Sequence, residues 1–150
     1  MKTKKWSRIP SELEIASFDG LHCRKKYAEC VRTGWTCPCC DRSVFELIRW
    51  SEITGPSWRA KYADEHGMGF TIALHEHHCH GSGRFPRTLI CGDCNWADGA
   101  VKRKYKLPAD WSFSPAEIRC FVKMKPHSGE ATIIYEVARQ IYMSVTGKQI

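Results

Sequence analysis

Two Cys-x-x-Cys pairs are the residues of this chain whose type and spacing predict chemistry most directly: Cys37–Cys40 and Cys91–Cys94. Two thiolates at this spacing occupy one edge of a tetrahedral zinc site, and a second pair completes it. Residues 41–90 lie between the pairs, so a shared ion would close a long loop and stabilise a small chain. Cys39 offers a further thiol, but two intervening residues suit a single ion best. We therefore predict a structural zinc site. A thioredoxin-like redox centre is the other use of Cys-x-x-Cys, and it needs no second pair.

A histidine cluster lies between the two pairs, and an asparagine follows the second. The cluster is His75-Glu76-His77-His78-Cys79-His80, and Asn95 comes directly after Cys94. The cluster alone has two simple interpretations: a solvated polar loop, or a second zinc site built from His75, His77, Cys79 and His80. Neither interpretation accounts for the position of Asn95.

Taken together, these residues resemble the HNH (His-Me finger, ββα-metal) nucleases. The segment from Cys91 to Gly99 is similar to the Cys-x-x-Cys-Asn-x-Ala-x-Gly segment of the recombination endonuclease VII family. Arg87 and the alternating histidines fit the pattern of that family as well. The resemblance covers roughly residues 27–104. Two features depart from it: the family usually has aspartate where this chain has His77, and the stretch between Cys40 and His75 is longer.

The resemblance implies a catalytic site. His78 is expected to act as the general base, and a histidine side chain suits this role because it titrates near neutral pH. His77 and Asn95 are expected to hold one divalent metal, Mg²⁺ or alternatively Mn²⁺. His80 and Arg87 are expected to contact the phosphate or orient its neighbours. A surface ion pair for Arg87 and a minor loop role for His80 are equally open.

The charge of the chain predicts a polyanionic partner. Its 150 residues carry a formal net charge of +7, with an isoelectric point near 9.0, and neutralising phosphates releases counterions. A basic run near the predicted site is expected to contact the DNA backbone, together with Arg87, although such runs are usually solvated helix faces; its members are Lys102, Arg103 and Lys104. Trp58, close to Arg59 and Lys61, is a second candidate for contact with nucleic acid.

The resemblance implies that the substrate is DNA and favours branched DNA, including Holliday junctions. Such enzymes usually act as homodimers, because two strands must be cut symmetrically. A phage or mobile-element origin is typical of the family. Two alternatives stay open: a homing or restriction-type HNH endonuclease or nickase acting on linear duplex, and a non-catalytic zinc module that binds nucleic acid.

The elements that must position these residues predict an α+β fold, with a zinc-stabilised ββα-metal core and flanking helices. Residues 1–10 form a basic arm, 11–107 the zinc-bound core, and 108–150 C-terminal helices that pack on the core or form a dimer interface. Alternation from Phe70 to His75 predicts a strand that runs into the cluster, and Thr88–Ile90 a second strand. A helix then begins near Asn95.

Helix signals elsewhere are local. Ser11 with Glu14, and Ser114 with Pro115 and Glu117, predict capped helix starts. The apolar residues of Ser43–Trp50 predict a short helix, and the 3.6-residue period after about Glu130 predicts the last helix. The chain shows no signal peptide and no apolar run of membrane-spanning length. We therefore expect a reducing cytoplasm, that of the host for a phage protein.

Overall fold

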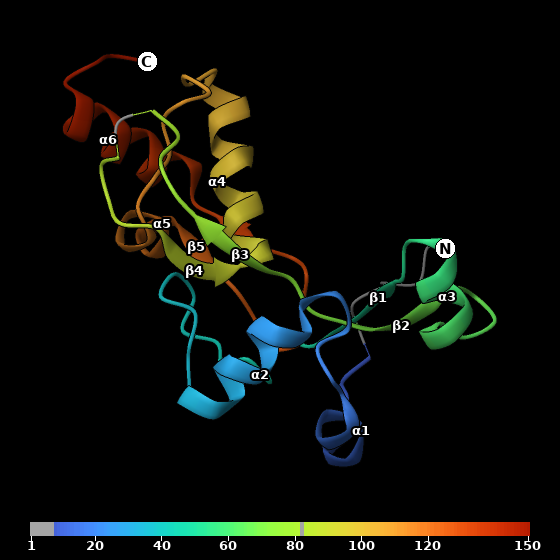
Figure 1. Cartoon of the computed structure of the whole chain (residues 1–150). Coiled ribbons are helices and arrows are strands. Elements are labelled where there is room, and N and C mark those ends of the chain that lie inside the picture. The colour runs from blue at the N-terminus through green and yellow to red at the C-terminus, as the bar shows by residue number, and fades with distance from the viewer. Residues whose placement is uncertain (1–7, 82) are drawn as a thin grey trace. The chain divides into compact units, whose positions relative to one another are not determined.

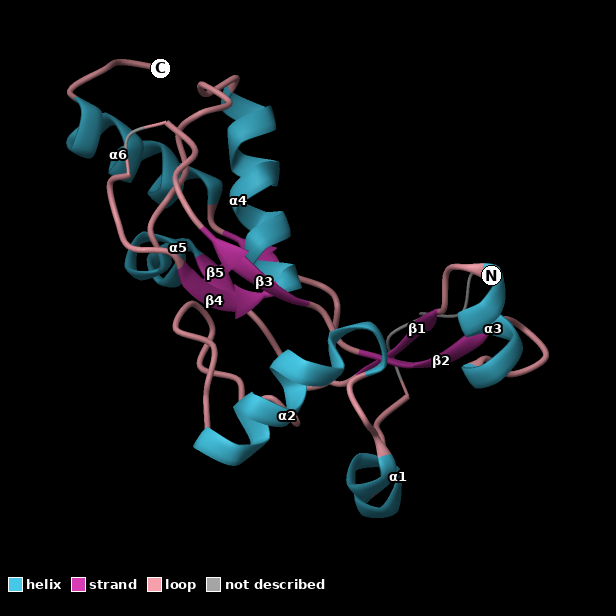
Figure 2. Cartoon of the chain, in the orientation of Figure 1, coloured by secondary structure: helices cyan, strands magenta, loops and turns pink. Residues whose placement is uncertain are grey.

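The computed structural model describes residues 8–81 and 83–150, so the first seven residues of the predicted basic arm (1–10) lie outside the described residues. The fold class is α+β, as predicted: helices alternate with small antiparallel two-stranded sheets (Figures 1 and 2). The described chain divides into two compact units. Unit 1 comprises residues 8–36, 42–73 and 125–130, and unit 2 comprises residues 37–41, 74–124 and 131–150. The segment predicted as the core, 11–107, thus contributes to both units.

Unit 1 contains the elements that precede the histidine cluster. Its helices are α1 (Glu12–Ser17), the 3₁₀ turn η1 (Leu21–Cys23), α2 (Arg24–Thr33) and α3 (Pro56–Tyr62), and its sheet pairs β1 (Arg49–Glu52) with β2 (Met68–Thr71). The capping box at the start of α1 is confirmed: Glu14 N donates to Ser11 Oγ, and Ser11 N donates to the Glu14 carboxylate. These local hydrogen bonds satisfy amides that the first turn leaves open.

Two predicted elements of unit 1 are wrong. Residues predicted as a helix, Ser43–Trp50, form a turn followed by β1. Ser43 and Glu46 exchange capping hydrogen bonds, but the helix stops after this turn because pairing with β2 makes Arg49 and its successors extended. The strand predicted over 70–75 is divided, since β2 ends at Thr71 and the next strand begins at Leu74.

Unit 2 is built around a hairpin followed by a long helix. Strand β3 (Leu74–His77) pairs with β4 (Thr88–Cys91), and α4 (Gly92–Tyr105) follows β4 without a loop and packs on both strands. The other elements are α5 (Pro115–Phe121), β5 (Val122–Lys123) paired with β6 (Thr132–Ile133), and α6 (Tyr135–Thr146). Helix α6 runs beside α4 and α5 (Figure 1).

The C-terminal predictions are confirmed at one helix and corrected at the other. Ser114 caps α5 in a capping box with Glu117, and Pro115 occupies the first turn. Helix α6 begins at Tyr135 rather than near Glu130, because Thr132 and Ile133 pair with β5 first. Side chains with no exposed surface fill the core of the unit, among them Ile90, Val101, Phe113, Ile118 and Phe121. No helix within residues 8–81 and 83–150 combines the length and apolarity needed to cross a bilayer.

Candidate functional site

The four predicted cysteines of unit 2 form one buried cluster. Their sulfur atoms all lie within 4.8 Å of one another. The Sγ atoms of Cys40 and Cys91 are 3.9 Å apart. A tetrahedral zinc with Zn–S bonds of about 2.3 Å requires S–S separations of about 3.8 Å. Cys37 and Cys94 have no exposed surface, whereas Cys40 is partly exposed. The cluster can therefore hold a structural zinc with only small movements of its ligands.

The junction between β4 and α4 places the second cysteine pair. Cys91 is the N-cap of α4, and its Sγ accepts from Cys94 N at 3.4 Å. Cys91 N donates to Cys37 Sγ at 3.4 Å, which ties the two pairs together. Amide donors and the positive end of a helix both favour thiolates. Hydrogen bonds from neighbouring thiols, that of Cys39 foremost, hold the pKa of Cys37 far below its usual range. Hydrogen bonds with Cys37, the largest influence, raise the pKa of Cys91 and Cys94 in turn. Without a metal the cluster therefore favours thiolate at Cys37 rather than at all four sulfur atoms, and binding zinc would release the remaining protons.

A second polar group of unit 2 joins His77, the last residue of β3, to Asn95 on α4. His77 is buried, its Nδ1 lies 3.1 Å from Asn95 Oδ1, and its Nε2 lies 2.6 Å from the Phe113 carbonyl oxygen. A carbonyl only accepts, so Nε2 carries a proton and the neutral ring keeps its lone pair at Nδ1. Two acceptors then face each other. About 3 Å also separates neighbouring oxygen or nitrogen ligands of one octahedral Mg²⁺ with bonds of about 2.1 Å.

The short distance between Nδ1 and Oδ1 has three physical explanations. In one, the imidazole is doubly protonated, and Nδ1–H donates to Asn95 Oδ1. The other two apply to the neutral ring. A bound cation would hold both lone pairs, with Nδ1 and Oδ1 as adjacent ligands. Alternatively, the amide of Asn95 turns over, and its NH₂ group donates to Nδ1 as in an ordinary buried polar pair. His77 and Asn95 thus fit a metal as two ligands, and solvent or substrate would complete its coordination.

Asp98 fixes the carbonyl that orients His77. Phe113 N donates to Asp98 Oδ1 at 2.8 Å, so the Phe113 residue is held from both sides of its backbone. Burial, its largest influence, raises the pKa of the Asp98 carboxyl. Lys102 Nζ lies 3.8 Å from Asp98 Oδ2 and donates to Ser112 Oγ. The motifs of the sequence predict no role for Asp98. Its spacing of three residues after Asn95, on the same helix face, was the available signal.

His78 and His80 lie in the loop that joins β3 to β4. His78 is half-buried, and its Nδ1 lies 3.2 Å from the Glu76 carbonyl oxygen. By the same tautomer argument, Nδ1 donates and Nε2 keeps a lone pair that can accept a proton. The exposed ring of His80 meets that of His78 edge-on, with centroids 4.2 Å apart. This pair presents imidazole nitrogens at the surface one residue beyond His77.

The alternative of a second zinc site is not supported. Within residues 8–81 and 83–150, the cysteine cluster is the one group of three or more His, Cys, Asp or Glu side chains whose ligand atoms converge. Cys79 is buried, and its thiol donates to the Asp110 carbonyl at 3.5 Å. His75 and His80 are exposed, whereas His77 is buried. The four residues therefore do not form one zinc centre.

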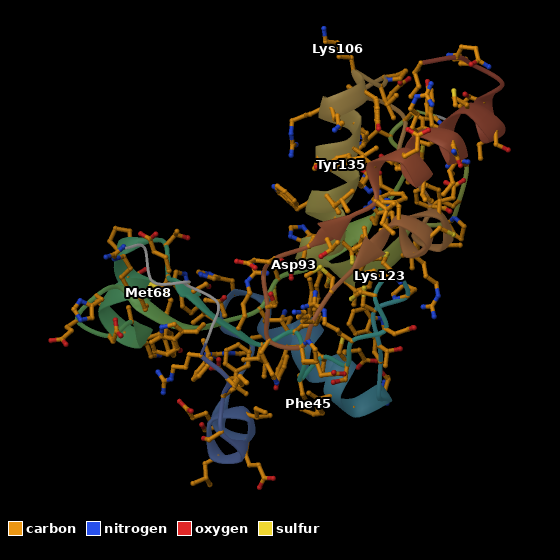
Figure 3. The ribbon with its side chains drawn as sticks, turned by 180° about the vertical axis from the view of Figure 1, so that it is seen from behind. Phe45, Met68, Asp93, Lys106, Lys123 and Tyr135 are labelled. Atoms are coloured by element: carbon orange, nitrogen blue, oxygen red, sulfur yellow. The ribbon has the colours of Figure 1, made fainter. Side chains whose placement is uncertain are left out.

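The predicted DNA contacts divide into exposed and internal side chains. Arg87 is 61% exposed, and its Nη1 lies 3.4 Å from the Glu76 carboxylate. Arg103 and Lys104 are exposed near the C-terminal end of α4, which Lys106 marks in Figure 3. Lys102 is only 16% exposed and is engaged with Asp98. Its charge balances a buried carboxylate, so Lys102 is better explained as a structural residue.

No protein-family model, no curated protein and no solved structure matches this chain. The side chains that unit 2 brings together are therefore the indication of function in this chain. These are the four cysteines, the pair formed by His77 and Asn95, and the adjacent imidazole of His78.

Proposed function

We propose that this protein is a metal-dependent endonuclease of the HNH type, which hydrolyses phosphodiester bonds in DNA. The hairpin β3–β4 and helix α4 would form its ββα-metal unit. One observation carries the proposal: His77 Nδ1 and Asn95 Oδ1 are 3.1 Å apart, while the Phe113 carbonyl holds the His77 tautomer that leaves Nδ1 unprotonated. The motif resemblance around Cys91 and Asn95 supports the same conclusion.

In the proposed reaction, His77 and Asn95 would hold a divalent metal, Mg²⁺ or Mn²⁺. When bound, the metal would supply Lewis-acid stabilisation of the negative charge that develops on the phosphate oxygens. His78 Nε2 accepts a proton from a water molecule. The water oxygen attacks phosphorus, the bond between phosphorus and the 3′ oxygen breaks, and the leaving oxygen takes a proton from solvent. The Glu76 carbonyl stabilises the imidazolium that His78 becomes, because Nδ1–H continues to donate to it.

The remaining residues have supporting roles in this proposal. A zinc held by the four cysteines fixes the junction between β4 and α4, and so the position of Asn95. Exposed Arg87, Arg103 and Lys104 contact DNA phosphates, and His80 contacts the scissile phosphate or orients His78. Branched DNA is the proposed substrate, cut by a homodimer.

Cleavage assays on matched DNA substrates test the proposal. Zinc-loaded protein is incubated with a four-way junction and with linear duplexes of the same sequence, with and without added Mg²⁺. We expect cutting only with Mg²⁺, and faster on the junction. The His78→Ala variant, purified identically, controls for contaminating nuclease.

The outcomes separate the alternatives. Faster cutting of linear duplex would instead favour a homing or restriction-type enzyme or a nickase. DNA binding without cutting, under Mg²⁺ and Mn²⁺ alike, would leave a zinc module that binds nucleic acid. Because chelators also remove structural zinc, Mg²⁺ is omitted rather than chelated in the control.

A further inference from the structure

A surface pocket of about 300 Å³ lies in unit 1, in the part of the chain between the two cysteine pairs that the proposed nuclease chemistry does not use. Arg24, at the start of α2, lines one side. The other lining residues are on α3: Ser57, Trp58, Lys61 and Tyr62. Their spacing along the helix places them on one exposed face. The pocket is thus made by two helices of the same unit.

Aromatic rings form the floor of this pocket. Trp58 and Tyr62 are stacked, with ring centroids 5.5 Å apart and an interplanar angle of 23°. His22 meets Trp58 edge-on at 4.5 Å. Both stacked rings are only partly buried. Partly exposed, nearly parallel rings offer a flat surface on which a further planar ring can stack.

Cationic side chains surround the rings. Arg24 Nη2 donates to the Tyr62 hydroxyl at 3.3 Å, and Lys61 Nζ lies 5.1 Å from the Tyr62 ring centroid. Lys25 and Lys26 are exposed in the first turn of α2. One carboxylate offsets part of this charge, since Asp19 pairs with Arg24 at 2.8 Å. The two charged residues that line this pocket, Arg24 and Lys61, are both cationic, whereas Glu14 and Asp19 line an adjoining pocket that shares Tyr62.

The combination of aromatic rings and cationic side chains indicates which class of ligand this pocket would bind. Quaternary ammonium groups also bind between aromatic rings, but Arg24 and Lys61 would repel them. A planar, apolar ring attached to a negative charge satisfies both features, and a nucleotide has both a base and a phosphate. The volume is near the lower end of the range of about 300–1,000 Å³ for small-ligand sites, which suits one nucleotide rather than a duplex.

We propose that this pocket binds an unpaired nucleotide of single-stranded nucleic acid. The base extends the stack of Trp58 and Tyr62 at an outer face of the pair, while Arg24 and Lys61 hold its phosphate. Stacking on an aromatic side chain tolerates any base sequence, because every base has a π face. The inference does not require that unit 2 cuts DNA, since binding alone tests it.

Binding to labelled oligonucleotides tests the pocket. Fluorescence anisotropy is measured for zinc-loaded protein without added Mg²⁺, using a fluorescein-labelled oligo-dT of about ten nucleotides and a duplex of equal length. We expect Trp58→Ala to weaken oligo-dT binding by about tenfold or more, with duplex binding changed by less than about twofold. Trp58→Phe keeps a stacking ring and should retain most of the affinity.

Charge variants provide the second arm. Lys61→Glu should weaken oligo-dT binding more than Lys148→Glu, which makes the same change of charge at an exposed position in unit 2. Unaltered oligo-dT binding by folded Trp58→Ala, or equal losses for oligo-dT and duplex, would overturn the proposal. If Trp58→Ala does not fold, equal effects of the two lysine variants would overturn it. Because no step measures cleavage, failure here is distinct from failure of the nuclease proposal.

Discussion

The two polar centres of unit 2 differ in how many ligands each could supply to a metal ion. The cysteine cluster offers four sulfur atoms within 4.8 Å of one another, enough to fill a tetrahedral ion. The pair formed by His77 and Asn95 offers only two acceptors, 3.1 Å apart. A site with all its ligands from protein stabilises a fold, whereas one with few protein ligands leaves positions for water and substrate.

The two centres also differ in what holds them in place. Backbone amides of the β4–α4 junction fix the cysteines. His77 depends instead on Phe113, which depends in turn on Asp98. Helix α4 connects the centres, because Cys94 and Asn95 are adjacent residues in it. A zinc at the first centre would therefore position Asn95 in the second. Substitutions at the two centres should then separate effects on folding from effects on the proposed reaction.

The largest effect is expected at the four-cysteine cluster. Cys91→Ser should abolish zinc binding and unfold unit 2, because structural zinc contributes about 10–16 kcal/mol in small domains, which matches or exceeds a typical folding free energy of about 5–15 kcal/mol. Zinc content and near-UV circular dichroism measure this. Cys120→Ser, at an exposed thiol, is the matched control and should change neither. A folded, zinc-free Cys91→Ser protein would show that the cluster is not structural.

His78→Ala should remove catalysis without removing the fold. A general base contributes about 10²–10⁴-fold to rate, and His78 is only half-buried, so we expect that loss of rate with zinc content and thermal midpoint unchanged. Single-turnover cleavage of a junction under Mg²⁺ measures it. His66→Ala is the control, since the His66 side chain is 76% exposed in unit 1. Wild-type rates for His78→Ala would assign the base elsewhere.

Asn95 tests whether the second centre holds a metal. Asn95→Ala removes the oxygen and should cost at least the 10–100-fold typical of residues that support a metal ligand. Asn95→Asp replaces the amide with two oxygen acceptors. If Asn95 Oδ1 binds a metal ion, the Asp variant should still bind it. If the Asn95 NH₂ group instead donates to His77 Nδ1, the Asp variant should lose that hydrogen bond. Mn²⁺ titration of cleavage compares them. Equal loss in both variants would mean that the pair is an ordinary hydrogen bond.

The smallest effect is expected at Asp98. Asp98→Asn keeps an acceptor for Phe113 N–H, so we expect cleavage to fall by less than about threefold. Asp98→Ala releases Phe113 and should cost about 10–100-fold, through His77. The rate and the Mn²⁺ dependence are measured together, because a purely structural role would lower stability without altering metal dependence. Equal rates for the Asn and Ala variants would remove Asp98 from the site.

Local patterns gave reliable predictions where short-range hydrogen bonds decide the structure. The capping boxes at Ser11 and Ser114 start helices as predicted, since partners three residues apart satisfy open amides. At Ser43, local capping hydrogen bonds were not enough to predict the structure. Its capping hydrogen bonds form, but they give only a turn, because strand pairing with distant residues determines the conformation after Ile48.

The amino-acid sequence alone determined which side chains are candidates for metal binding and catalysis. These are four thiols at the spacing of metal ligands, a histidine cluster, and an asparagine beside the second cysteine pair. Tertiary structure decided their states. The Phe113 carbonyl, 36 residues beyond His77, sets which ring nitrogen of the neutral His77 is protonated. Lys102 pairs with buried Asp98, so its side chain is largely removed from solvent. The contact between His77 and Phe113 joins separate elements, so no local spacing could predict it. Asp98 and Lys102 have the four-residue spacing of an ordinary helix pair, but only the packing of α4 buries them.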